Sequence, residues 1–72
     1  MPPEPYAPTV EPVLAYAQRL ANFQGVPWSV VTIPEGSLAW NMGGRYAAVP
    51  DNELPHYINR GAEFVQGVTP TA

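Results

Sequence analysis

The sequence predicts a small α+β domain of order αβββαβ, in which a mostly antiparallel four-stranded sheet carries two helices on one face. Three observations support this class. Apolar residues recur at helical spacing from Val10 to Ala21, and a dense apolar run fills residues 28–33. The pair Gly43-Gly44 then separates two further short runs, which is typical of a β-hairpin.

The first helix is predicted over residues 9–24. Thr9 is a suitable N-cap, Gly25 is a suitable end, and Pro27 prevents continuation. Its apolar stripe comprises Val10, Val13, Leu14, Ala17, Leu20 and Ala21.

Three strands are predicted over residues 28–33, 38–42 and 45–49. The first is apolar on both pleat faces, which suits an interior strand. The second and third would form the hairpin, with Trp40 opposite Ala47. The reverse face of this hairpin is smaller and more polar, and is therefore expected to be open; it carries Ala39, Asn41, Tyr46 and Ala48.

A second helix is predicted from an N-cap at Asn52 to Arg60, ending at Gly61. A final strand follows over residues 62–66. A crossover of about 12 residues predicts that this strand runs parallel to the third and first strands. Placed beside the first strand, it gives the sheet order 3-2-1-4.

The domain organisation follows from these elements. Residues 9–66 are predicted to form one domain, residues 1–8 a proline-rich disordered lead, and residues 67–72 a frayed tail. A chain of 72 residues without cysteine has neither a disulfide nor a thiolate metal site. Such a chain buries only about 60% of its unfolded surface, so marginal stability is expected.

Charge and hydropathy exclude several classes of partner. The formal net charge is −3, and three arginines are the only basic residues besides one histidine. Nucleic-acid binding is therefore not expected, because a phosphate backbone requires a basic surface. No apolar run approaches the roughly 18 residues of a membrane span, and the N-terminus lacks a secretory pattern. A soluble, cytoplasmic protein is expected.

Catalytic patterns are nearly absent. His56 could act as a base, Ser37 or Ser29 as a nucleophile and Asp51 as an orienting group, but Ser37 lacks the G-x-S-x-G elbow. His56 fits a solvated helix face more simply. One histidine and scattered carboxylates match no metal motif. We therefore predict no enzyme activity, no catalytic residue, no metal and no cofactor.

The composition favours a binding function. Charged residues make up 12% of the chain, about half the usual share, and the aromatic residues comprise two Trp, four Tyr and two Phe. A domain this small cannot bury them all, and exposed aromatic surface is typical of interfaces. We predict a small acidic protein-binding module, acting as an inhibitor, adaptor or accessory subunit of a larger protein. The predicted protein-binding residues are Asn41, Arg45, Tyr46, Tyr57 and Arg60.

In size, mild acidity and lack of catalytic groups, the chain is similar to the small anti-defence inhibitors of phages and mobile elements, such as anti-CRISPR proteins. This similarity implies a protein partner and no cofactor. Two alternatives remain open. One is a self-assembling protein that forms a homodimer through the open sheet face or a sheet edge, and the other is a small-molecule binder.

Overall fold

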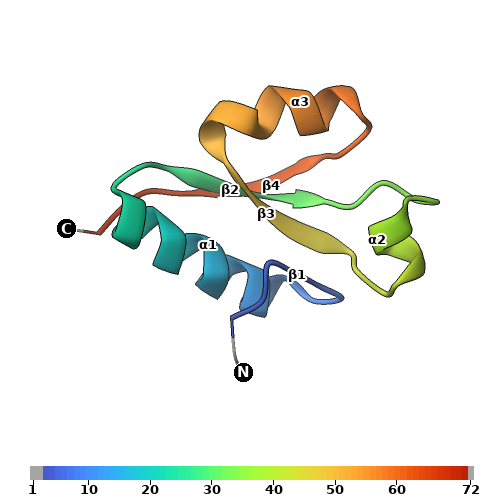
Figure 1. Cartoon of the computed structure of the whole chain (residues 1–72), viewed down its shortest axis with the longest axis horizontal. Coiled ribbons are helices and arrows are strands. Elements are labelled where there is room, and N and C mark those ends of the chain that lie inside the picture. The colour runs from blue at the N-terminus through green and yellow to red at the C-terminus, as the bar shows by residue number, and fades with distance from the viewer. Residues whose placement is uncertain (1–2, 72) are drawn as a thin grey trace.

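A four-stranded antiparallel sheet forms the middle layer of the fold (Figure 1). The computed structural model describes residues 3–71. The sheet order is β1-β3-β2-β4. The strands are β1 (Tyr6–Ala7), β2 (Trp28–Thr32), β3 (Tyr46–Pro50) and β4 (Phe64–Val68).

The helices lie on both sides of this sheet. Helix α1 (Val10–Gln24) covers one face, and α3 (Leu54–Asn59) covers the other (Figure 1). A 3-10 turn, η1 (Asp51–Glu53), leads into α3, and a single-turn helix, α2 (Leu38–Asn41), lies beyond the end of β2. No helix within residues 3–71 is long and apolar enough to cross a membrane.

The β2 strand explains the two-sided arrangement. Val30 is fully buried in the cluster that includes Val13 and Ala17 of α1, whereas Val31 is buried with Val49 and Ala62 in a second cluster that contacts α3. The predicted interior strand, apolar on both faces, is confirmed. The prediction that both helices share one face is wrong, because each apolar face of β2 requires its own cover.

Helix α1 matches its predicted range. Thr9 is the N-cap in an extended conformation, although its side chain makes no capping hydrogen bond. Gly25 adopts the left-handed conformation with φ of 70°, and its N–H donates to the carbonyl of Ala21 at 2.8 Å. This arrangement ends the helix as the glycine position predicted.

The predicted hairpin at Gly43-Gly44 is wrong, because residues 38–41 form α2 instead of a strand. Ser37 is its N-cap, and the Ser37 hydroxyl accepts a hydrogen bond from the Trp40 N–H at 3.3 Å. Gly43 has φ of 95° and follows the helix end. The alternation of residues 38–42 spans too few residues to distinguish a strand from one helical turn.

Loss of that strand changes the sheet order. β3 pairs directly with β2, matching Val31 to Ala47 and Val30 to Ala48, so the predicted order 3-2-1-4 is wrong. β4 lies beside β2, as predicted, but runs antiparallel to it. Since β3 is also antiparallel to β2, the predicted parallel direction of β3 and β4 is correct.

The second helix begins later than predicted. Asn52 lies in η1 and is not a helix N-cap, because Glu53 occupies that position before α3. The chain leaves α3 through Arg60 and through Gly61, whose φ is 104°.

Both chain ends are more ordered than the sequence predicted. Tyr6 and Ala7 pair with β3, and Ala7 is buried, so the prediction of a disordered lead is wrong at these residues. The tail is also not frayed at Val68, which belongs to β4, or at Thr71, whose N–H donates to Asn22 Oδ1 at 2.8 Å. The same predictions for residues 1, 2 and 72 fall outside the described residues.

Candidate functional site

The five residues predicted to bind a partner do not form one patch. Asn41 is exposed on α2, whereas Tyr46 lies on β3 and packs against the core cluster beneath α1. Tyr57 and Arg60 belong to the α3 side of the sheet, where Tyr57 packs against the second cluster. The structure therefore separates the predicted residues between two faces and α2.

Arg45 stabilises α2. Its guanidinium carbon lies 3.6 Å from the centroid of the Trp40 ring, a cation–π geometry. Its Nη1 also donates to the carbonyls of Trp40 and Gly44, at 3.0 and 2.9 Å. Because these contacts occupy the guanidinium within the chain, Arg45 is a structural residue in this conformation.

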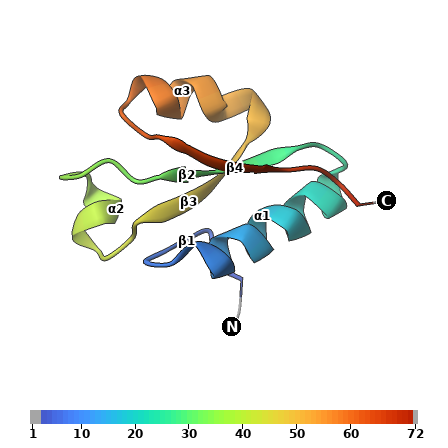
Figure 2. The ribbon, with the colours of Figure 1, turned by 180° about the vertical axis from the view of Figure 1, so that it is seen from behind.

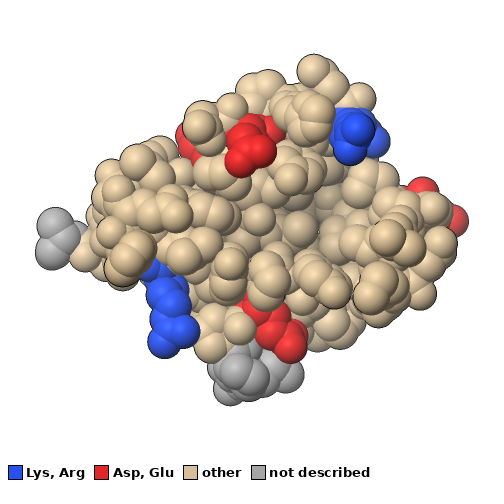
Figure 3. All heavy atoms as spheres, in the orientation of Figure 1, with Lys and Arg blue, Asp and Glu red and all other residues tan. Residues whose placement is uncertain are grey.

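Tyr57 and Arg60 line an apolar groove between α3 and α2, which we call the α3–α2 groove. Its volume is about 530 Å³, and buried Val31, Ile33 and Ala62 form its floor. Figure 3 shows this face of the molecule hollowed between α3 and α2, with uncharged atoms around the hollow. This groove is an apolar concavity that two of the predicted binding residues line.

Two polar side chains of the α3–α2 groove make hydrogen bonds within the chain. The Thr32 hydroxyl accepts a hydrogen bond from the Glu63 N–H at 2.9 Å, and the Ser37 hydroxyl donates to the Pro34 carbonyl at 2.8 Å. Arg60 is the only charged residue among those that line the groove. The groove thus offers an apolar floor with a cation at its margin.

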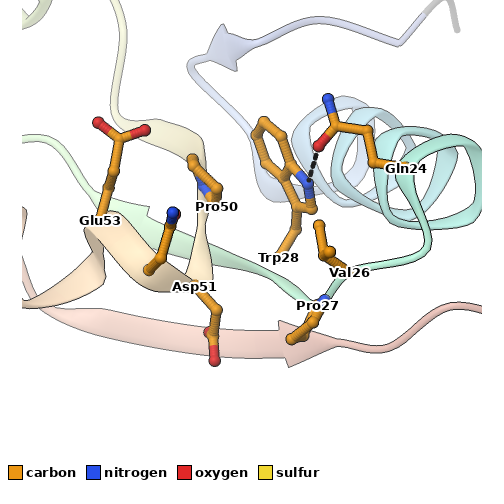
Figure 4. Close-up of a pocket in the computed structure, with 8 residues that line it drawn as sticks. Gln24, Val26, Pro27, Trp28, Pro50, Asp51 and Glu53 are labelled. Atoms are coloured by element: carbon orange, nitrogen blue, oxygen red, sulfur yellow. Dashed lines mark hydrogen bonds between the residues drawn. The ribbon is translucent and has the colours of Figure 1, made fainter.

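A second cavity of about 730 Å³ lies between the end of α1, the start of β2 and η1 (Figure 4). The indole Nε1 of Trp28 donates to Gln24 Oε1 at 3.2 Å. The carboxylates of Asp51 and Glu53 point in different directions and do not converge (Figure 4). These two acids therefore do not form the closely spaced pair that general acid–base chemistry or cation binding requires.

The candidate catalytic side chains have structural contacts. Ser29 is fully buried, and its hydroxyl donates to Asp51 Oδ1 at 2.7 Å. His56 is exposed and contacts Tyr57 edge to face, with ring centroids 5.7 Å apart. Across residues 3–71, no cluster of three or more His, Cys, Asp or Glu side chains could hold a metal ion.

The outer edge of β4 is the exposed feature that the predicted residue set missed. Among residues 3–71, β4 pairs only with β2, and its Phe64 and Val65 side chains are 54% and 39% exposed. Figure 2 shows β4 on the near side of the molecule, with no described segment crossing in front of it. Within β4 there is neither a charged residue nor a proline. That composition was the sequence signal for this site.

The two edges of the sheet differ. β1 is only two residues long and lies between Pro5 and Pro8, which are features that limit pairing at an edge. β4 is five residues long, and its only comparable feature is a bulge opposite Val30 and Val31. β4 is therefore the less protected edge.

Comparisons with known proteins found no matching protein family, no similar characterised protein and no similar solved structure.

Proposed function

We propose that this chain is a non-enzymatic protein-binding module, which recognises an extended segment of a larger protein by adding that segment as a strand beside β4. The observation that carries this proposal is the uncovered, uncharged edge of β4 with its exposed Phe64 and Val65. Strand addition of this kind is a common mode of peptide recognition.

Backbone groups of β4 would supply the affinity. The Thr32 N–H donates to the Glu63 carbonyl at 2.8 Å, so this pair is hydrogen-bonded across β2 and β4. Because hydrogen-bonded and non-hydrogen-bonded pairs alternate in an antiparallel ladder, the N–H and C=O of the next residue, Phe64, face outward. An incoming strand can pair with these groups.

Side chains of β4 would add apolar contact. Phe64 pairs with Val31, so its side chain lies on the α3 face of the sheet. The ring lies over Gly67: a Cβ added to Gly67 would be 3.6 Å from Phe64 Cζ. Full burial of an exposed Phe side chain contributes about 1.5–3 kcal/mol, and because Phe64 is already about half-buried, covering the rest would contribute about half of that. A partner strand with apolar residues facing Phe64 would bury it.

The small size and negative charge of the chain support the class of partner that we propose. A domain of 72 residues with net charge −3 has no basic surface for a nucleic-acid backbone, which supports a protein partner. Within that class we propose inhibition, bridging or an accessory role toward the partner, by analogy with small anti-defence inhibitors such as anti-CRISPR proteins.

Affinity capture with matched variants tests the proposal. The double variant Phe64→Lys/Val65→Lys places two charges on β4 and should reduce capture of the partner from an extract of the source cells at least tenfold. The control Leu38→Lys/Met42→Lys adds the same charge at α2, where both side chains are also exposed, and should retain the partner. Circular dichroism checks that both variants fold. Equal retention by the two variants would contradict the proposal.

Self-assembly through the same edge is the second candidate function, because an uncharged edge strand can also pair with its copy. A homodimer through the sheet face that was expected to be open is no longer supported, because that face is covered. Tyr46 and Ala48 pack against the core beneath α1, and residues 38–41 form α2. Light scattering at low micromolar concentration tests the edge form, and a monomer near 7.8 kDa would exclude it.

A further inference from the structure

We infer that the α3–α2 groove binds a linear alkyl monocarboxylate, whose hydrocarbon chain lies on the floor of the groove and whose carboxylate is held near Arg60. This inference goes beyond the proposed function, because it uses the groove and not the outer edge of β4. The groove opens on the face seen in Figure 3, whereas β4 is nearest the viewer in the opposite view of Figure 2.

The size and lining of the groove suit such a ligand. Small-molecule sites typically measure about 300–1,000 Å³ and combine an apolar lining with a few polar groups. The groove measures about 530 Å³, and its floor is formed by the aliphatic residues Val31, Ile33 and Ala62. Tyr6 and Tyr57 add aromatic walls from β1 and α3.

Charge at the groove favours an anionic head group. Arg60 is exposed and is the only charged residue among the lining residues. Within residues 3–71 its guanidinium takes part in none of the side-chain hydrogen bonds, in contrast to that of Arg45. It can therefore pair with a carboxylate without giving up an intramolecular partner.

The hydrogen-bonding state of the floor favours an alkyl chain over a peptide. Ala47 pairs with Tyr6 on one side and with Val31 on the other, so the backbone of the floor is engaged within the sheet. The Thr32 hydroxyl also accepts a hydrogen bond from the Glu63 N–H, and the Ser37 hydroxyl donates one to the Pro34 carbonyl. The engaged backbone of the floor cannot pair with the N–H and C=O groups of a bound peptide, so burying a peptide against it is unfavourable. A hydrocarbon chain brings no such groups.

Titration calorimetry with alkyl carboxylates tests the inference. Octanoate, decanoate and dodecanoate, each kept below its micelle concentration, should bind with one-to-one stoichiometry. Each added CH₂ that enters the groove should tighten Kd roughly fourfold, as expected from about 0.8 kcal/mol per buried CH₂. Decan-1-ol should bind more weakly than decanoate, because it lacks the charge.

Two arginine variants separate the role of Arg60 from a general charge effect. Arg60→Gln should weaken decanoate binding by roughly 1.4- to fivefold, the range of an exposed ion pair, and leave decan-1-ol binding unchanged. The matched control is Arg19→Gln on the exposed surface of α1, which removes the same charge and should bind decanoate like the native chain. Both side chains are exposed, so neither replacement disturbs the core.

A groove-filling variant and an NMR map complete the test. Ala39→Phe, at the α2 wall, should abolish decanoate binding while the chain keeps its circular dichroism spectrum. Amide shifts on titration should concentrate at residues 31–33, 57 and 60–62. The inference would be overturned by absent binding, by equal affinity for decanoate and decan-1-ol, or by shifts confined to the cavity at Trp28. Binding of a peptide with an apolar C-terminus, but of no alkyl carboxylate, would overturn it as well.

Discussion

At the scale of single residues, the hydrogen bond between Ser29 and Asp51 ties β2 to the start of η1. Ser29 has no exposed surface, and its hydroxyl depends on the Asp51 carboxylate at 2.7 Å. A buried hydroxyl without a partner is costly, so this contact fixes where the chain leaves β3.

Replacing Asp51 should therefore destabilise the fold more than replacing Ser29. Asp51→Ala leaves the buried hydroxyl unpaired and should cost about 1–3 kcal/mol, whereas Ser29→Ala removes the hydroxyl itself and should cost about 0.5–1.5 kcal/mol. Urea unfolding measures both, with exposed Asn52→Ala as the control, expected to change stability by less than about 0.5 kcal/mol. A larger loss of stability in Ser29→Ala than in Asp51→Ala would contradict this role of the hydrogen bond.

Gly44 lies where a larger residue would collide with its neighbours. A Cβ built there would lie 2.9 Å from Ile33 Cδ1, 3.0 Å from Tyr6 Cδ2 and 3.1 Å from the Ala39 carbonyl oxygen. Since one of these neighbours is backbone, relief requires α2 to shift.

Gly44→Ala should consequently destabilise the protein by about 1–3 kcal/mol through overpacking. Gly36→Ala provides the contrast, because Gly36 has φ of 85° and open space around it, so only backbone strain of about 1–2 kcal/mol applies. Amide NMR distinguishes the two causes: shifts should spread to Ile33 and Tyr6 in Gly44→Ala and remain local in Gly36→Ala. Local shifts in both variants would refute the predicted clash.

At the scale of elements, α2 could not be predicted from the alternation of apolar residues. Five residues of alternating character fit a strand or one helical turn equally well. The choice depends on contacts that periodicity does not report: the Ser37 cap and the packing of Arg45 on Trp40. By contrast, α1 and β2 were predictable, because a long helical stripe and an apolar run on both faces each allow one interpretation.

Arg45→Ala should loosen α2 selectively. Loss of the cation–π contact, worth about 0.5–1 kcal/mol, and of two hydrogen bonds should speed amide exchange at Met42, whose N–H donates to Leu38 at 3.1 Å. The expected increase is roughly fivefold or more, while amides in β2 keep their rates. Arg45→Lys keeps the charge without the planar group, so its exchange rate at Met42 should lie between those of the native chain and Arg45→Ala. Unchanged exchange at Met42 would show that the stacking does not hold α2.

The sheet edges could be predicted only in part. β1 comprises two residues between prolines, which is too short for a periodic signal, and its pairing with β3 depends on the position of β3 in the finished sheet. The predicted binding residues lie apart in the structure because their positions also depend on the finished sheet. Arg45 and Tyr46 are adjacent in sequence, yet one stacks on α2 and the other packs beneath α1.

At the scale of the whole molecule, both proposals use surface that lies outside the core. One sheet sandwiched between α1 and α3 uses the apolar faces of β2 for the core. The outer edge of β4 and the α3–α2 groove lie outside this core and are accessible. The sequence predicted a binding role from its few charges, and we propose that the outer edge of β4 serves that role.

Hydrogen exchange on the chain, free and bound to its captured partner, tests the central claim most directly. If the partner adds a strand to β4, the outward amide of Phe64 should exchange freely in the isolated chain and more than tenfold slower in the complex. Amides on the exposed side of α1 should keep their rates. Protection confined to α1 or α3, with the Phe64 amide unchanged, would contradict recognition through β4.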